Sequence, residues 1–297
     1  MENTLNTRSM IFTLYGDYIR HYGNEIWIGS LISLLQEFGH NEQSVRAAIS
    51  RMNKQGWIQS KRVGNKSFYS LTDIGKARME EAAERIYKIK PHSWDGKWRI
   101  LMYNIPEEIR NVRDELRQEL IWSGFGSMST SCWLSPNPLE KQVYGLIEKY
   151  EIKEYVNFFI SQYDGPKEDQ SLIKKCWNLD EINERYEEFM REYSQKYVIA
   201  KNKIEKGNMT DGQCFVERTI LVHEYRKFLF IDPGLPAELL PDKWLGDSAA
   251  DLFSEYYVAL AKKASQFFEG VFRKGNEKVK VSKDFDVLSH PLMIDTE

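Results

Sequence analysis

The feature that most constrains this fold is a change in hydrophobic periodicity at Gly56. Before it, three segments carry apolar residues three or four positions apart, which is the spacing of the buried face of a helix. A short turn centred on Gly39 separates the second segment from the third, and a helix-turn-helix requires such a turn. We therefore expect helices over residues 8–22, 27–38 and 42–55.

After Gly56 the sequence becomes typical of short strands. Residues 57–60 and 67–71 flank a Gly64-Asn65 turn, which predicts a β-hairpin. A further helix is expected over 73–89. Three helices followed by a hairpin form the pattern of a winged helix-turn-helix domain.

From residue 91 onward, strands and helices alternate, which is typical of a small ferredoxin-like α+β sandwich, and the chain then becomes mainly helical. The predicted strands are 98–103, 127–134 and 155–161, and the predicted helices are 108–122, 138–149, 180–197, 212–230 and 248–272. The predicted fold class is therefore α+β. Its domains are an N-terminal winged helix-turn-helix at 1–90, a central ferredoxin-like domain at 91–175 and a mainly helical C-terminal domain at 176–297.

Charge is distributed unevenly along the chain. The formal net charge is −3, yet residues 1–90 hold thirteen Lys and Arg against nine Asp and Glu, a net of +4. Within 42–66, six basic residues face one acidic residue. A basic N-terminal module on an acidic remainder fits a protein that docks one end on a polyanion, although a window of this charge also arises by chance.

The third predicted helix carries the strongest candidate DNA contacts. Its apolar stripe consists of Val45, Ala48, Ile49 and Met52. With that stripe inward, the opposite face is polar and basic and suits insertion into a major groove. Gln43 and Arg46 lie near the helix N-terminus, where they could pair with adenine and guanine. The candidate phosphate contacts on this helix are Ser44, Ser50, Arg51 and Lys54. A solvated helix face is the alternative.

The predicted hairpin adds three more candidate DNA contacts, Lys61, Arg62 and Lys66. In the functional interpretation, these side chains touch phosphate or the minor groove as a wing. In the alternative, they keep an exposed turn soluble. The flexible Gly64 beside Asn65 and Lys66 favours the wing.

The sequence carries no recognisable catalytic or metal site. Its five histidines lack the spacing of metal ligands, and its three cysteines lie too far apart for a zinc knuckle or a disulfide framework. There is no glycine-rich phosphate loop and no nucleophile elbow. We therefore expect a protein that is not an enzyme and that needs neither a metal nor a cofactor.

No apolar run is long enough to span a membrane, and the N-terminus lacks the pattern of a secretory signal. A cytoplasmic protein without a membrane partner is therefore expected.

Four residues are candidates for contacting a small effector. His223, Arg226 and Trp244 flank a proline-rich loop, Asp232–Pro236, that could clamp an anionic ligand or could equally be a fixed hinge. Trp133 could line a ligand site or could fill the core of the small sandwich.

Several stretches of this sequence resemble the PaaX family, repressors of phenylacetic acid degradation in bacteria. The matching stretches are Ser44–Met52 with Gly56-Trp57, Trp94–Arg99, Trp133–Pro136, and Arg226–Phe228 leading to Asp232–Gly246. The resemblance implies a homodimeric transcriptional repressor that binds double-stranded operator DNA through its winged domains. It also implies an acyl-CoA effector, typically phenylacetyl-CoA, that releases the DNA.

The central segment also resembles the ferredoxin-like CRISPR-associated nuclease subunits, so a metal-dependent nuclease built on this domain is the alternative function. Those subunits carry an aspartate at the end of the first strand, where this chain has Asn104. An amide lacks the second anionic oxygen that a metal ion needs for tight coordination, which argues against cleavage.

Overall fold

The computed structural model describes residues 5–87, 93–165 and 169–275, and these form two compact units. The first unit combines residues up to Lys88 with Phe189–Arg226 and with the chain from Ser248 onward. The second unit combines Ile89–Glu188 with Lys227–Asp247. Helices and two antiparallel sheets occur together, which confirms the α+β class. The boundaries at 90 and 175 stay a prediction about domains.

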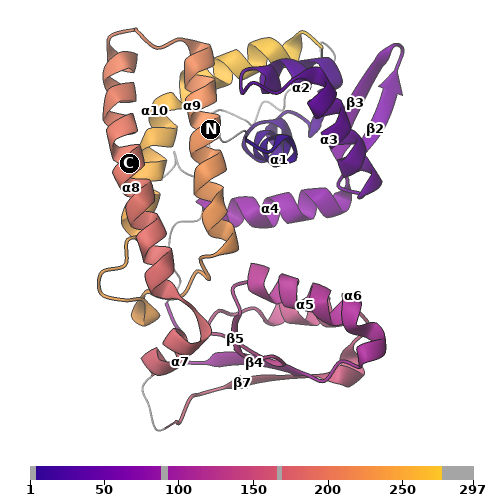
Figure 1. The fold of residues 1–297 in the computed structure, drawn as a ribbon, viewed down its shortest axis with the longest axis vertical. Coiled ribbons are helices and arrows are strands. Elements are labelled where there is room, and N and C mark those ends of the chain that lie inside the picture. Colours follow the sequence, from indigo (N-terminus) through magenta and orange to yellow (C-terminus); the bar gives the residue numbers. More distant parts are fainter. Residues whose placement is uncertain (1–4, 88–92, 166–168, 276–297) are drawn as a thin grey trace. The chain divides into compact units, whose positions relative to one another are not determined.

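The N-terminal part of the first unit contains helices and one three-stranded antiparallel sheet (Figure 1). Its elements are α1 (Thr7–Asp17), a 3-10 turn (Ile19–His21), β1 (Glu25–Trp27), α2 (Ile28–Gln36), α3 (Glu42–Lys54), β2 (Ile58–Val63), β3 (Lys66–Leu71) and α4 (Asp73–Tyr87). β3 is the central strand, between β1 and β2.

Local sequence explains the boundaries of the turn between α2 and α3. Gly39 has a φ of +79°, a left-handed conformation that a glycine adopts without strain. Asn41 then caps α3, because its side chain accepts a hydrogen bond of 2.8 Å from the backbone N–H of Ser44.

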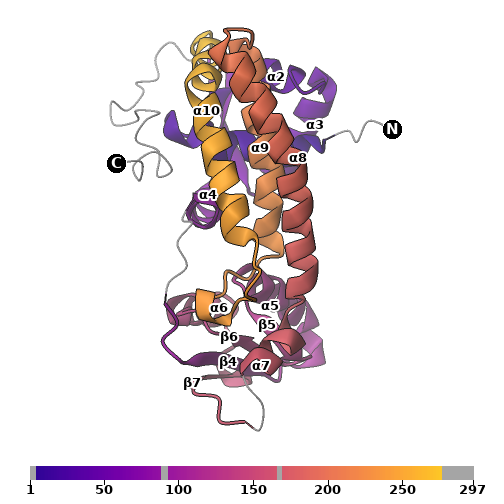
Figure 2. The same cartoon turned by 90° about the vertical axis from the view of Figure 1, so that its left-hand side faces the viewer.

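Three long helices complete the first unit, and Figure 2 shows them running alongside one another. They are α8 (Leu179–Glu205), whose residues from Phe189 belong to this unit, α9 (Asp211–Tyr225) and α10 (Gly246–Arg273). Aromatic rings join them. Tyr225 of α9 stacks on Phe253 of α10 with centroids 4.1 Å apart, and Tyr197 of α8 packs on Tyr256 of α10. Helix α1 packs against both α3 and α9.

The second unit is built around a four-stranded antiparallel sheet in the order β5-β6-β4-β7. Its elements are β4 (Trp98–Tyr103), a 3-10 turn (Glu107–Ile109), α5 (Arg110–Trp122), β5 (Gly126–Ser129), β6 (Cys132–Ser135), α6 (Glu140–Lys149), a 3-10 turn (Lys153–Tyr155), β7 (Val156–Ser161), α7 (Asp169–Cys176) and a 3-10 turn (Ala237–Leu239). Leu101, Tyr103 and Trp133 from the sheet pack with Leu116 and Val143 from α5 and α6 in one core.

Several predicted element boundaries were wrong. The single strand over 127–134 is a hairpin, because the chain turns at Thr130-Ser131 between β5 and β6. The helix over 8–22 ends at Asp17, where Tyr18 leaves helical geometry with φ −126° and ψ −62°. The helix over 212–230 ends at Tyr225 and continues as a tighter 3-10 segment, Arg226–Phe230. Strand β1 and helix α7 were not predicted.

Candidate nucleic-acid interface

Helix α3 has the two faces that its sequence predicts. The four apolar residues of its stripe are all buried, with exposures of at most 2%, which confirms that prediction. On the other side, Gln43, Arg46, Ser50, Arg51 and Lys54 are exposed, and Ser44 is half-buried. The structure therefore brings these predicted contact residues together on one helix, with a polar and basic surface.

Arg46 already has a partner on the same helix. Its Nε donates a hydrogen bond of 2.7 Å to Oε1 of Glu42, and both side chains are more than half exposed. An exposed pair of this kind contributes only about 0.3–0.5 kcal/mol. Arg46 can therefore exchange Glu42 for another acceptor at little cost.

The hairpin of β2 and β3 carries its basic residues on the strands themselves. Lys61 and Arg62 are exposed on β2, where they pair across the sheet with Phe68 and Ser67 of β3. The Nε of Arg62 donates to the carbonyl of Gly64 at 3.3 Å. The strands extend closer to the turn than predicted, so the register fixes the positions of Lys61 and Arg62.

Lys66 differs from the other two wing residues because it contacts its own chain. Its Nζ lies 5.1 Å from the centroid of the Trp27 ring and 3.5 Å from the carbonyl oxygen of Gly275. Trp27 belongs to β1 and pairs with Phe68. The sequence reasoning missed this contact because it did not predict β1. Lys66 thus links the hairpin to the C-terminal end of α10.

A buried charge cluster joins α1 to α9 and α10. Nε and Nη2 of Arg218 each donate to the carboxylate of Asp17 at 3.1 Å. The Tyr257 hydroxyl donates to Asp17 at 2.7 Å, and Arg218 also donates to that hydroxyl and to Ser265. Burial lowers the pKa of Arg218, but the charge and hydrogen bonds of Asp17, together with the nearby Tyr18 and Tyr257, outweigh burial and raise the pKa well above its ordinary value. Arg218 therefore stays charged. No pattern in the sequence indicated this cluster.

Two predicted effector contacts, His223 and Arg226, lie in the first unit and also contact α1. Nδ1 of His223 is 2.9 Å from Oγ1 of Thr13, and both residues are buried. Arg226 donates to the carbonyl and the hydroxyl of Ser9, and burial lowers its pKa to about 10. The structure thus gives both residues a role in holding α9 against α1.

The other two predicted effector contacts, Trp133 and Trp244, lie in the second unit. Trp133 is 2% exposed and donates from its indole N–H to the Tyr103 hydroxyl at 3.3 Å. Its position favours the alternative that it fills the core. Trp244 packs edge-to-face on Tyr186 with ring centroids 5.5 Å apart, and Tyr186 also stacks on Phe228.

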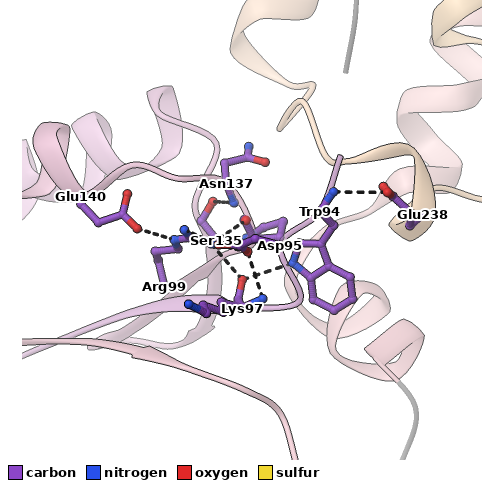
Figure 3. Close-up of polar contacts among 9 residues, drawn as sticks. Trp94, Asp95, Lys97, Arg99, Ser135, Asn137, Glu140 and Glu238 are labelled. Carbon is purple, nitrogen blue, oxygen red and sulfur yellow. Dashed lines mark hydrogen bonds and ion pairs between the residues drawn. The ribbon is translucent and has the colours of Figure 1, made fainter. Parts of the chain in front are cut away.

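Arg99 is the centre of a polar cluster in the second unit (Figure 3). Its guanidinium donates two hydrogen bonds of 2.8 Å to the two oxygens of Asp95 and one of 2.8 Å to Glu140. It also donates to the carbonyl oxygens of Lys97 and Pro136. These hydrogen bonds from Arg99 lower the pKa of Asp95. Because Arg99 is buried and fully paired, it fixes the start of β4 against the segment before α6.

The same cluster reaches the proline-rich loop. Nδ2 of Asn137 donates to the carbonyl oxygens of Pro233 and Gly234. The backbone N–H of Trp94 donates to Glu238 (Figure 3). A side chain on Gly124 could not fit, since a Cβ there would lie 2.4 Å from the Pro233 carbonyl oxygen. Sequence stretches that lie far apart in the chain are thus fastened together, and sequence reasoning missed Asn137, Glu140 and Glu238.

The described ranges contain no cluster of side chains that could bind a metal ion. Among residues 5–87, 93–165 and 169–275, no group of three or more His, Cys, Asp or Glu could hold a metal ion. Asn104 is exposed just after β4, and its backbone N–H donates to the carbonyl of Tyr155. In the same ranges, every helix is too short or too polar to cross a lipid bilayer.

Comparison with known proteins gives matches along most of the chain. Three family models match: PaaX-like protein over residues 6–75, PaaX protein central Cas2-like domain over 91–173, and PaaX-like protein C-terminal domain over 177–270. The transcriptional repressor PaaX of Escherichia coli K12 is 34% identical over 274 residues, which cover 91% of this chain and 84% of that protein. The solved structure of the uncharacterized protein Rv0674 from Mycobacterium tuberculosis is 24% identical, with a TM-score of 0.45, and the match covers 80% of this chain and 89% of that one. The family models and the identity to the Escherichia coli repressor establish that this chain belongs to the PaaX family.

Proposed function

We propose that this protein is a ligand-responsive transcriptional repressor of phenylacetate catabolism genes, which binds operator DNA as a homodimer and is released by an acyl-CoA. The observation that carries the proposal is the polar, basic and exposed face of α3 on a helix whose apolar stripe is fully buried. The similarity to a transcriptional repressor supports the same conclusion. The protein acts in the cytoplasm, where its operator lies, and it is not an enzyme.

The N-terminal elements supply a winged helix-turn-helix. In this arrangement α3 enters the major groove, which is about 12 Å wide and admits a helix. Gln43 and Arg46 read base edges from the first turns of α3, and Ser44, Ser50, Arg51 and Lys54 bond phosphates. Lys61, Arg62 and Lys66 form the wing and contact the backbone or the minor groove.

Two copies of the chain then read two half-sites. In a dimer, the recognition helices fit successive major grooves when the half-sites lie about 34–36 Å apart or a multiple of that distance. The four-stranded sheet, with its βαββαβ element order, provides a ferredoxin-like domain between the first and last parts of the sequence.

The effector binds more tightly to a conformation of the dimer in which the two recognition helices do not match the spacing of the half-sites. A ligand shifts such an equilibrium only through its different affinity for the two states, and a tenfold loss of DNA affinity needs about 1.4 kcal/mol of coupling. The packing of α1 on α9 supports a direct structural connection between the candidate effector contacts and the DNA-binding elements. His223 and Arg226 both hold α9 against α1, and α1 also packs against α3. We retain His223, Arg226 and Trp244 as candidate effector contacts. Trp133 was the fourth residue predicted to contact the effector, and its buried position favours a role in the core instead.

Selection of genomic DNA fragments by the purified protein tests the DNA role. The proposal expects a small set of fragments from promoter regions, sharing a two-fold symmetric sequence. Arg46→Ala should broaden the selected sequence at one position of each half-site, whereas Lys203→Ala, an exposed lysine on α8, should select the same fragments as the wild type. Selection without any shared sequence would overturn the proposal.

A further inference from the structure

The surface of α3 that carries the candidate DNA contacts includes a single acidic residue. Glu42 is the first residue of this helix, at the end that the proposed function places against the bases. Within residues 42–66 it is the one acidic residue beside six basic residues. Its side chain is 57% exposed and contacts Arg46, so it lies on the surface that would face a polyanion. A negative charge there repels the phosphates of every DNA sequence and therefore lowers affinity.

Glu42 holds one edge of the Arg46 guanidinium and leaves the other edge available. Nε of Arg46 donates to Oε1 of Glu42 at 2.7 Å. In the described ranges, neither Nη1 nor Nη2 of Arg46 has a hydrogen-bond partner. These two nitrogens can donate side by side to O6 and N7 of a guanine. Arg51 and Lys54, the other basic residues of α3, have no such carboxylate partner among the described residues.

The ion pair between Glu42 and Arg46 distinguishes a base from a phosphate. O6 and N7 of guanine are neutral acceptors, whereas a phosphate oxygen carries negative charge. A phosphate that accepted a hydrogen bond from Arg46 would lie next to the Glu42 carboxylate, and the repulsion strengthens as water leaves the interface. Guanine meets no such repulsion. A charge that penalises the wrong partner increases specificity even where it lowers affinity.

We infer that Glu42 is a specificity residue of the DNA-binding surface, which positions Arg46 for guanine and prevents Arg46 from binding phosphate at other sequences. The inference rests on the proposed function and deepens it. A purely structural role is the alternative, because an acidic residue in the first turn stabilises a helix. That role predicts a change in stability without a change in how the protein discriminates between DNA sequences.

Glu42→Gln tests the inference, since it removes the charge and keeps the size of the side chain. Fluorescence anisotropy measures affinity for an operator fragment that genomic selection recovers, for operators with single base changes, and for an unrelated duplex. Binding to the unrelated duplex should become about threefold tighter, because one repulsive charge is gone. The ratio of operator affinity to unrelated affinity should fall about tenfold, the discrimination that one good base contact gives. The loss should be confined to the base position that Arg46→Ala also relaxes.

Two matched variants separate positioning from other effects of the lost charge. Glu80→Gln removes the same charge from an exposed residue on α4 and should keep the ratio of the wild type. In the Arg46→Ala background, Glu42→Gln should no longer change the base preference, because the side chain that Glu42 positions is absent. Thermal unfolding followed by circular dichroism verifies that each variant is folded.

The outcomes distinguish this inference from the proposed function. Sequence-specific binding by the wild type, with an unchanged ratio in Glu42→Gln, would overturn the role of Glu42 and leave the repressor role intact. Equal losses at base positions away from Arg46, or the same loss in the Arg46→Ala background, would indicate a structural role and overturn the inference as well. A wild type that prefers no DNA sequence would overturn the proposed function and, with it, the role of Glu42.

Discussion

Asp17 and Arg218, which lie 201 positions apart in the sequence, form an ion pair whose side chains are 0% and 3% exposed. Asp17 is the last residue of α1, and Arg218 lies in the middle of α9. The pair fastens a helix next to the proposed recognition helix to a helix near the end of the chain. The N-terminal module and these C-terminal helices therefore form one cooperative structure rather than two loosely joined parts.

The first prediction concerns the stability of this pair. Asp17→Asn leaves the Arg218 guanidinium buried without its counter-charge, which costs about 3–5 kcal/mol for a buried pair that loses one partner. Urea unfolding followed by circular dichroism should show this loss as a lower midpoint. Arg273→Gln breaks the exposed pair with Glu269 and should change the unfolding free energy by less than about 0.5 kcal/mol.

The double variant Asp17→Asn with Arg218→Met completes this test. Because it removes both charges together, it should be more stable than Asp17→Asn alone. If the double variant loses as much unfolding free energy as Asp17→Asn and Arg218→Met lose together when measured singly, the two residues do not act as a pair.

The second prediction concerns base reading by α3. Arg46→Ala should weaken operator binding by about 1–3 kcal/mol and relax the base preference at one position of each half-site. Binding to a panel of operators with single base changes measures both effects. Equal weakening on every sequence would place Arg46 on the phosphate backbone instead.

The third prediction concerns the wing. Lys61→Ala and Lys66→Ala should each lower the slope of log affinity against log salt by about one unit, since each lysine displaces one counterion from a phosphate. Titrations at several salt concentrations give the slope, with Lys203→Ala as the control that should leave it unchanged. Slopes equal to that of the wild type would place the hairpin away from the DNA.

The fourth prediction concerns acid stability of the second unit. The hydrogen bonds from Arg99 lower the pKa of Asp95 in the folded state. This pairing therefore adds stability above the ordinary pKa of an aspartate, about 3.9, and the stability is lost as the pH falls through the lowered pKa. Asp95 is partly exposed, so solvent reduces the size of the effect.

Unfolding free energies between pH 2 and pH 6 measure this effect in the wild type and in Asp95→Asn. The variant should be less stable near pH 6 and should lose less stability on acidification, so the two curves converge at low pH. Parallel curves would show that Asp95 contributes no acid sensitivity.

Periodicity predicted the elements that have long and regular patterns. The stripe from Val45 to Met52 repeats at helical spacing, and Asn41 gives α3 a strong cap, so the sequence alone places the buried and exposed faces of this helix. β1 has only three residues, too few to show alternation, and it exists because β3 offers it an edge to pair with. The turn at Thr130-Ser131 contains neither glycine nor proline, so nothing in the sequence interrupts the predicted strand.

Contacts between distant segments could not be predicted from one sequence. Arg218 looks like an ordinary helical arginine until the fold places Asp17 beside it. The family resemblance singled out the stretch around Arg99, but only the fold identifies Glu140 as its partner. Two residues proposed for the effector, His223 and Arg226, occur beside the proline-rich loop in sequence, yet their hydrogen bonds go to α1.

The measurement that tests the repressor proposal most directly is fluorescence anisotropy of labelled promoter DNA from the protein's own gene cluster, with and without phenylacetyl-CoA. The repressor proposal predicts tight binding that phenylacetyl-CoA reverses and that free phenylacetate leaves intact. Binding that persists at saturating phenylacetyl-CoA would contradict the proposed effector, and the absence of salt-dependent binding to any promoter fragment would contradict the DNA-binding role itself.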